Sequence, residues 1–192
     1  MRLNRRSPAV LAAASLAVLG VAIAFAQPNP NVMVGKAAPA FSAPGSDGKT
    51  HTLDSLTAGG DTVILYFISE TCPINAEALP HFKKIGAAHK NNSKAKLIGV
   101  FNGTKAEFDS WNKTNKVTFT TLFDPELEII RSYRAAFSPW SLVIGPDKKV
   151  SRSWAGYSRT SLQNLNALMA QKGGMKVPAL TYPGAPAEMS GG

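Results

Sequence analysis

The feature of this chain that most constrains its fold is a run of β-branched and aromatic residues, Thr62–Ile68, that leads into Cys72-Pro73. A continuous apolar run of this length suits a strand that is buried on both faces of a parallel sheet. Proline is tolerated at the first position of a helix, where its missing N–H leaves no hydrogen bond unmade. The pattern therefore places Cys72 between a central strand and the helix that follows it.

Strand and helix patterns alternate along the rest of the chain. Helical spacing of apolar residues indicates helices at 53–56, 73–89, 104–115, 124–133 and 160–171. A capping box of Thr104 and Glu107 marks one helix start, and Pro80 falls inside another helix, where it should cause a kink. Apolar and β-branched runs indicate strands at 41–43, 50–52, 62–68, 95–101, 117–122, 140–144 and 150–155.

This order of elements predicts the fold class. The first two strands flank the turn sequence Gly45-Ser46-Asp47-Gly48-Lys49 and should form an N-terminal β-hairpin. Strands that then alternate with helices, and end in an antiparallel pair, give an α/β sandwich. We therefore expect a central mixed β-sheet that is flanked by helices.

The N-terminus has the pattern of a secretory signal peptide. Three arginines precede an apolar run at 8–25, and Ala24-Phe25-Ala26 fits a cleavage site. The run also approaches the length that spans a bilayer, so an uncleaved anchor, and with it membrane contact, is the alternative. We expect an exported protein, periplasmic or secreted. Its parts would be a signal peptide at 1–26, a linker at 27–33, one domain at 34–172 and a disordered tail at 173–192, which is rich in Gly, Pro, Ser and Ala.

Cysteine count and charge exclude some classes of function. One cysteine in 192 residues rules out an internal disulfide framework. The net charge is +9, but the lysines are scattered and not clustered with aromatic residues, so we predict no nucleic-acid partner. A single thiol in an exported protein indicates intermolecular pairing or a reactive group, whereas a buried, inert cysteine is the structural alternative.

The position of Cys72 has opposing effects on its chemistry. The thiolate is the reactive form of cysteine, and the free N–H groups of a helix start favour that anion. Glu70 lies two residues earlier, and its negative charge disfavours a second anion nearby. Which effect prevails depends on how deeply the sulfur is buried.

Several motifs together resemble the thioredoxin-like superfamily, and most closely its redoxin branch, which includes the alkyl hydroperoxide reductase/thiol-specific antioxidant proteins. Cys72 matches the first position of the C-x-x-C motif, and Pro80 matches the helix-kinking proline of that family. Ser138-Pro139, before a strand and a terminal hairpin, is similar to the family's cis-proline loop. Residues 34–41 and Asp47-Gly48-Lys49 fit the redoxin opening. The resemblance spans about residues 34–172 and implies a thioredoxin-like sandwich.

The chain departs from the family at two positions. Asn75 stands where the second cysteine of C-x-x-C would be, so a mixed disulfide on Cys72 could not be released within the chain. The peroxiredoxin motif is half present, because Ser69 matches its hydroxyl position but Leu65 replaces its proline.

The resemblance implies roles for the residues near Cys72. Ser69, Thr71 and the backbone near Pro73 would hydrogen-bond the thiolate, and Arg134 would stabilise it as an arginine does in peroxiredoxins. The substrate cleft would be shaped by the segment Ser138-Pro139-Trp140. The structural alternatives are a surface arginine, a proline that starts a strand and a tryptophan that packs in the core.

We predict no metal site and no cofactor. Three histidines, His51, His81 and His89, are zinc or copper ligands in principle. However, His81 is nine residues from Cys72 on the same predicted helix, which is nearly the opposite face. Copper-delivery relatives of this fold use a cysteine pair, which this chain lacks.

Together these observations favour an exported, thioredoxin-fold thiol oxidoreductase. Cys72 would attack a disulfide or a peroxide, and an external thiol reductant or partner protein would resolve the product. The alternative is a non-catalytic binding or scaffold domain that has lost its second active-site cysteine, because fold alone does not fix function. A buried sulfur would favour that alternative, and a cleft that exposes the sulfur beside Pro139 would favour the enzyme.

Overall fold

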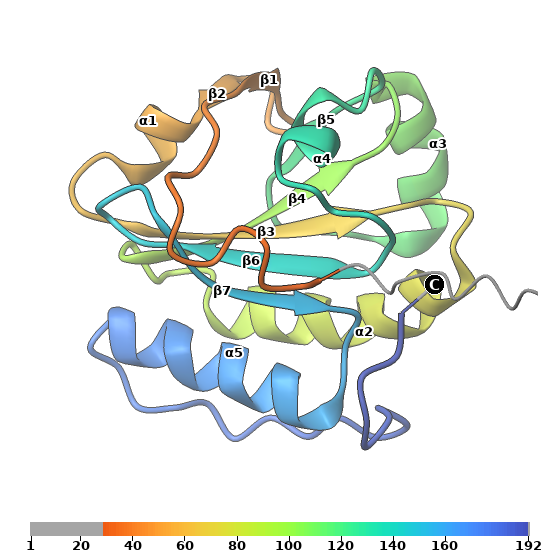
Figure 1. Ribbon diagram of the computed structural model, residues 1–192. Helices are drawn as coiled ribbons and strands as arrows, with labels where there is room; N and C mark the ends of the chain where they lie inside the picture. Colours follow the sequence, from red (N-terminus) through yellow and green to blue (C-terminus); the bar gives the residue numbers. More distant parts are fainter. Residues whose placement is uncertain (1–28, 192) are drawn as a thin grey trace, which may run out of the picture.

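A five-stranded mixed sheet lies at the centre of the computed structural model, which describes residues 29–191 (Figure 1). The strands lie in the order β5-β4-β3-β6-β7. β3 is parallel to β4 and antiparallel to β6, and a separate two-stranded antiparallel sheet, β1–β2, precedes them. The predicted α/β sandwich with an N-terminal hairpin is therefore confirmed. The strands are β1 (Ser42–Pro44), β2 (Thr50–Thr52), β3 (Thr62–Ile68), β4 (Ala95–Phe101), β5 (Thr121–Phe123), β6 (Trp140–Ile144) and β7 (Val150–Ala155).

Helices cover both faces of the sheet (Figure 1). One face is covered by α2 (Pro73–Ala88) and α5 (Arg159–Lys172), and the other by α1 (Leu53–Thr57) and α4 (Glu128–Ser132). α3 (Lys105–Asn115) begins with the predicted capping box of Thr104 and Glu107. α2 begins with Pro73 directly after Cys72, and Pro80 lies inside it.

β3 is the buried strand that the sequence predicts. All seven of its residues are buried. Its side chains alternate between the two halves of the core, as strand geometry requires. Ile64, Tyr66 and Ile68 pack with α2 and α5, whereas Val63, Leu65 and Phe67 pack with α1 and α4. The strand is thereby fixed from both sides, and its carboxyl end holds the segment that carries Cys72.

Two elements begin later than the sequence predicts. The strand expected at 117–122 is β5, which covers only Thr121–Phe123. The Asn112 side chain accepts a hydrogen bond from the Val117 N–H (2.6 Å) and donates one to the Val117 carbonyl (3.4 Å). These two bonds hold the stretch around Val117 outside the sheet. The helix expected from Asp124 is α4, which starts at Glu128. The Asp124 carboxylate accepts hydrogen bonds from two backbone N–H groups at the start of α4.

The C-terminal segment, which we expected to be disordered, packs against the domain in the structure. Tyr182 and Ala185 are buried beside α2 and α5. Ser190 exchanges two backbone hydrogen bonds with Tyr157, of 2.8 and 2.9 Å. Figure 1 shows this segment running along α5 and rising toward the start of α2. Its low apolar content suggested disorder, yet a few apolar side chains and main-chain pairs are enough to fix it.

The predicted signal peptide lies outside the described residues. Within residues 29–191, no helix is long and apolar enough to cross a membrane.

Candidate active site

Cys72 caps the start of α2, where the sequence places it. Its backbone is extended, with φ −82° and ψ 116°, and Pro73 occupies the first turn. Cys72 is half-buried, so part of the residue is exposed to solvent. The thiol Sγ donates to the backbone carbonyl of Ser138 at 3.1 Å. The sulfur therefore faces the loop that we expected to form the cleft.

That loop is tied to the end of β3 by a serine side chain. The Ser138-Pro139 peptide bond is cis. Ser138 Oγ donates to the carbonyl of Phe67 (3.1 Å) and accepts from the N–H of Ser69 (3.3 Å). These bonds hold the loop beside Cys72, so that segments distant in the sequence meet at one point. A loop that is fixed beside a thiol in this way can hold a substrate against it.

A cavity of about 470 Å³ opens beside the sulfur. We call it the thiol cavity. Most of its wall is apolar, and three polar residues, Ser69, Asn102 and Ser138, also contribute. Its remaining lining residues are Phe67, Ile68, Cys72, Pro73, Ile74, Leu127, Ile130, Ala135, Ala136 and Phe137. An accessible thiol in such a cavity can attack a disulfide whose neighbouring groups are apolar.

Asn75 fills the position of the missing second cysteine and is 1% exposed. The Tyr66 hydroxyl donates to Asn75 Oδ1 at 2.7 Å, and Asn75 Nδ2 donates to the Ser69 carbonyl at 3.3 Å. Burial raises the pKa of Tyr66 well above its ordinary value, so this hydroxyl keeps its proton and remains a donor. Asn75 thus joins β3 to the Cys72 loop, and its amide cannot act as a nucleophile.

Ser69 and Thr71 lie in the Cys72 loop, but their hydroxyls contact each other at 3.4 Å. Cys72 Sγ instead donates its hydrogen bond to the backbone carbonyl of Ser138. Ser69 lines the thiol cavity, whereas Thr71 is exposed and does not. Both residues shape the loop around Cys72, and the predicted hydroxyl bonds to the sulfur are not among the contacts of the described residues.

Two other predicted site residues lie away from the sulfur. Trp140 is 1% exposed, donates from Nε1 to Ser153 Oγ at 3.0 Å and packs edge-on against Phe137. It is therefore a core residue and not part of the cleft wall. Arg134 is exposed and lines a neighbouring cavity, so the structure does not place it as a partner of the thiolate.

Sequence reasoning missed the residues that form the far wall of the thiol cavity. Asn102 directly follows β4, and its Nδ2 lies 3.5 Å from Ser69 Oγ. Because β4 is parallel to β3, their carboxyl ends meet at one edge of the sheet, and this rule could have identified Asn102. Leu127 and Ile130 come from the α4 region, which the sequence pattern did not relate to Cys72.

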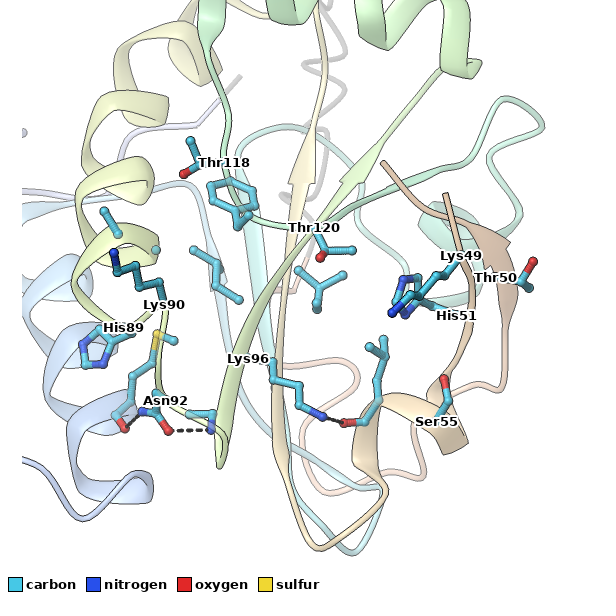
Figure 2. A pocket seen from close by; sticks show the side chains of 18 residues that line it. Lys49, Thr50, His51, Ser55, His89, Lys90, Asn92, Lys96, Thr118 and Thr120 are labelled. Atoms are coloured by element: carbon cyan, nitrogen blue, oxygen red, sulfur yellow. Dashed lines mark hydrogen bonds between the residues drawn. The ribbon is translucent and has the colours of Figure 1, made fainter. Parts of the chain in front are cut away.

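A larger cavity, of about 730 Å³, lies at the other end of α2 and contains no thiol (Figure 2). Lysines 49, 90 and 96 line it together with His51 and His89. Its buried polar groups join neighbouring elements. His89 Nε2 lies 2.8 Å from Asn166 Oδ1, and Asn92 Nδ2 donates to the Met169 carbonyl. We therefore interpret these bonds as structural.

The three histidines are distributed over separate contacts. His51 lies 2.9 Å from Asp47, and His81 packs between Tyr157 and Tyr182. Within residues 29–191, no three His, Cys, Asp or Glu side chains are grouped so that they could hold a metal ion.

Comparison with known proteins finds a relative that is named for thiol chemistry. The sporulation thiol-disulfide oxidoreductase A of Bacillus subtilis (strain 168) is 25% identical over 105 residues, which cover 53% of this chain. The chain matches 64% of that relative's length, less than two thirds.

Solved structures support the same fold. A candidate protein disulfide isomerase from Bacteroides thetaiotaomicron matches with a TM-score of 0.65 and 26% identity, over 72% of this chain and 89% of that one. A candidate thiol:disulfide interchange protein DsbE from Chlorobium tepidum matches with a TM-score of 0.62 and 22% identity, over 71% and 95%. The chain therefore has the thioredoxin-like fold found among thiol-disulfide oxidoreductases.

The family comparison agrees with the motifs around Cys72 and with the fold. The matched segment starts before β1 and ends within β7, so it contains Cys72, Asn75 and the Ser138-Pro139 loop. Residues 34–153 match the AhpC/TSA family, and the chain belongs to this family.

Proposed function

We propose that this protein is an exported thiol oxidoreductase that uses Cys72 as its single nucleophile for disulfide exchange. The observation that carries this proposal is the half-exposed Cys72, whose Sγ lies in the thiol cavity 3.1 Å from the Ser138 carbonyl. An inert core cysteine would be buried and would line no cavity. The structure thus favours a working thiol over a scaffold domain.

The proposed reaction has two exchange steps. In the first, the Cys72 thiolate attacks a substrate disulfide, a new S–S bond forms at Sγ, and the departing sulfur leaves as a thiolate. In the second, an external thiolate attacks the mixed disulfide and releases Cys72 unchanged. One substrate sulfur is released as a thiol and the other leaves joined to the external thiol in a new disulfide, so electrons balance, and a second equivalent of the external thiol completes the reduction of the substrate. Asn75 cannot carry out the second step, which is why an external thiol or partner protein is needed.

Disulfide exchange fits the site better than peroxide reduction. The described residues that line the thiol cavity include no arginine to stabilise charge on a reacting peroxide. Their apolar side chains suit the groups that flank a disulfide in a peptide. The relatives named above as thiol-disulfide oxidoreductases support the same reaction. Export is supported by the signal-peptide pattern at residues 1–26.

The test is to trap Cys72 in the native protein. The purified protein is incubated with a peptide disulfide or with hydrogen peroxide, and the products are identified by intact mass spectrometry, with dimedone present to capture sulfenic acid. We expect a one-to-one mixed disulfide that a second thiol releases, and no adduct in Cys72→Ser. A thiol that is labelled only after unfolding, or that forms only the dimedone adduct, would contradict disulfide exchange.

A further inference from the structure

A second cavity, of about 410 Å³, adjoins the thiol cavity. Arg131 and Arg134 line it, and we call it the arginine cavity. Ile130, Ala135 and Ala136 line both cavities, so the two share a wall. The remaining lining residues of the arginine cavity are Asn29 and Val32. Two arginine side chains therefore lie next to the space in which Cys72 would react.

The charge of these arginines is not neutralised locally. Neither arginine forms an ion pair with a carboxylate of the described residues, and no acidic residue is among those that line the cavity. Arg131 Nη1 donates to the backbone carbonyl of Glu126 at 3.1 Å, which orients this side chain and leaves its other N–H groups for a ligand. Both arginines are exposed, so a ligand from solution can reach them.

The backbone directs the side chains of both arginines to one cavity. Arg131 lies in the last turn of α4, and Arg134 follows two residues after the helix ends. Arg134 has a left-handed backbone, with φ 55°, and the next residue, Ala135, donates its N–H to the Ile130 carbonyl at 3.1 Å. The chain thus turns back at Arg134, so that both side chains line the same space.

The planar guanidinium group matches a carboxylate by paired hydrogen bonds. Because the arginine cavity shares a wall with the thiol cavity, a ligand that spans the two and carries a thiol would reach the disulfide on Cys72. We propose that the arginine cavity binds a carboxylate of a small acidic thiol, which resolves the mixed disulfide on Cys72. This inference rests on the proposed function and adds the chemical class of the reductant. It also gives Arg134 a role in binding the incoming thiol rather than in stabilising the Cys72 thiolate.

The step is a simple exchange. The thiolate of the acidic thiol attacks the substrate sulfur of the mixed disulfide, the bond between that sulfur and Sγ breaks, and the electron pair leaves with Sγ as the Cys72 thiolate. The carboxylate stays at the arginines throughout. Its binding raises the local concentration of the thiol at the cavity, so the expected effect is on the apparent affinity of the thiol more than on the limiting rate.

The test uses a matched pair of thiols, glutathione and its diethyl ester, which differ in their carboxylates. Cys72 of the purified protein is first converted to its thiopyridyl disulfide, and release of the neutral thione is followed by absorbance. Each rate is divided by the rate of the same thiol with a small thiopyridyl disulfide, which removes intrinsic reactivity. Three variants are compared with the parent protein. One is the double variant Arg131→Gln/Arg134→Gln, and the second is Arg134→Lys, which keeps the charge. The third, Arg152→Gln, removes an exposed arginine of β7 that lines neither cavity and serves as the control.

We expect glutathione to react about five- to tenfold faster than its ester, the factor that a partly exposed charged contact provides. The double Gln variant should lose this preference, Arg134→Lys should keep part of it, and Arg152→Gln should keep all of it. Equal rates for the two thiols in the parent, or a preference that survives in the double variant, would overturn the inference. If the native protein does not form the thiopyridyl disulfide at all, the proposed function fails instead.

Discussion

The hydroxyl of Tyr66, on the central strand, donates a 2.7 Å hydrogen bond to Asn75 Oδ1, on the first turn of α2. Both residues are almost fully buried. The Nδ2 group of the same Asn75 amide donates a hydrogen bond to the carbonyl of Ser69. A residue at the second position of the C-x-x-C spacing therefore fixes the loop that positions Cys72. Asn75 supplies no thiol at this position, and its amide holds the Cys72 loop in place.

Asn75→Ala should destabilise the fold by about 1–3 kcal/mol, because it leaves the buried Tyr66 hydroxyl without its acceptor. Tyr66→Phe should also destabilise it, and the double variant should cost less than the sum of the two singles, since each single variant leaves one buried group unpaired. Urea unfolding, followed by tryptophan fluorescence, measures all three. Strictly additive losses would show that the two side chains are not coupled.

Asn75→Cys should convert the site into a pair of thiols at C-x-x-C spacing. The new thiol would lie one helical turn from Cys72, where it can attack a mixed disulfide within the chain. We expect the mixed disulfide to disappear without an external thiol and an internal disulfide to form, as measured by intact mass spectrometry after trapping. Asn75→Ser, which is isosteric with cysteine but unreactive, is the control. A mixed disulfide that persists in Asn75→Cys would mean that position 75 is misoriented for resolution.

The sequence allowed prediction of the fold and the position of Cys72, because these follow from local patterns. The apolar run Thr62–Ile68 and the proline after Cys72 were enough to place a strand end and a helix start. The surroundings of the sulfur depend on contacts between distant segments. No local sequence pattern indicates the two hydrogen bonds of Ser138 Oγ or the cavity wall formed by residues 127–137. The packing of Trp140 into the core depends on which face of β6 it occupies.

Gly156→Ala should release the C-terminal segment. Gly156 has φ 91°, and a Cβ on it would lie 2.3 Å from the Ser190 carbonyl oxygen, which pairs with Tyr157. Both effects oppose the observed packing. We expect faster proteolysis after residue 173 and a loss of stability. Gly174→Ala is the matched control, because its φ is 62° but a Cβ there meets nothing within 4 Å. Equal proteolysis of the two variants would show that strain alone, and not the contact with Ser190, accounts for the effect.

Acidification should destabilise the protein through His81. Burial, together with the nearby Lys84, lowers the pKa of His81 below its usual value of 6.5 in the folded state. The unfolded chain therefore binds a proton that the folded chain does not, so stability is full above pH 6.5 and falls as the pH drops toward the lowered folded pKa.

His81 packs between Tyr157 and Tyr182, and its Nδ1 has no hydrogen-bond partner among the described residues, so a neutral aromatic ring is a suitable replacement. His81→Phe should flatten the dependence of the melting temperature on pH below about pH 6.5. His51→Phe, at a more exposed histidine that pairs with Asp47, serves for comparison. An unchanged pH profile in His81→Phe would assign the acid sensitivity to another group.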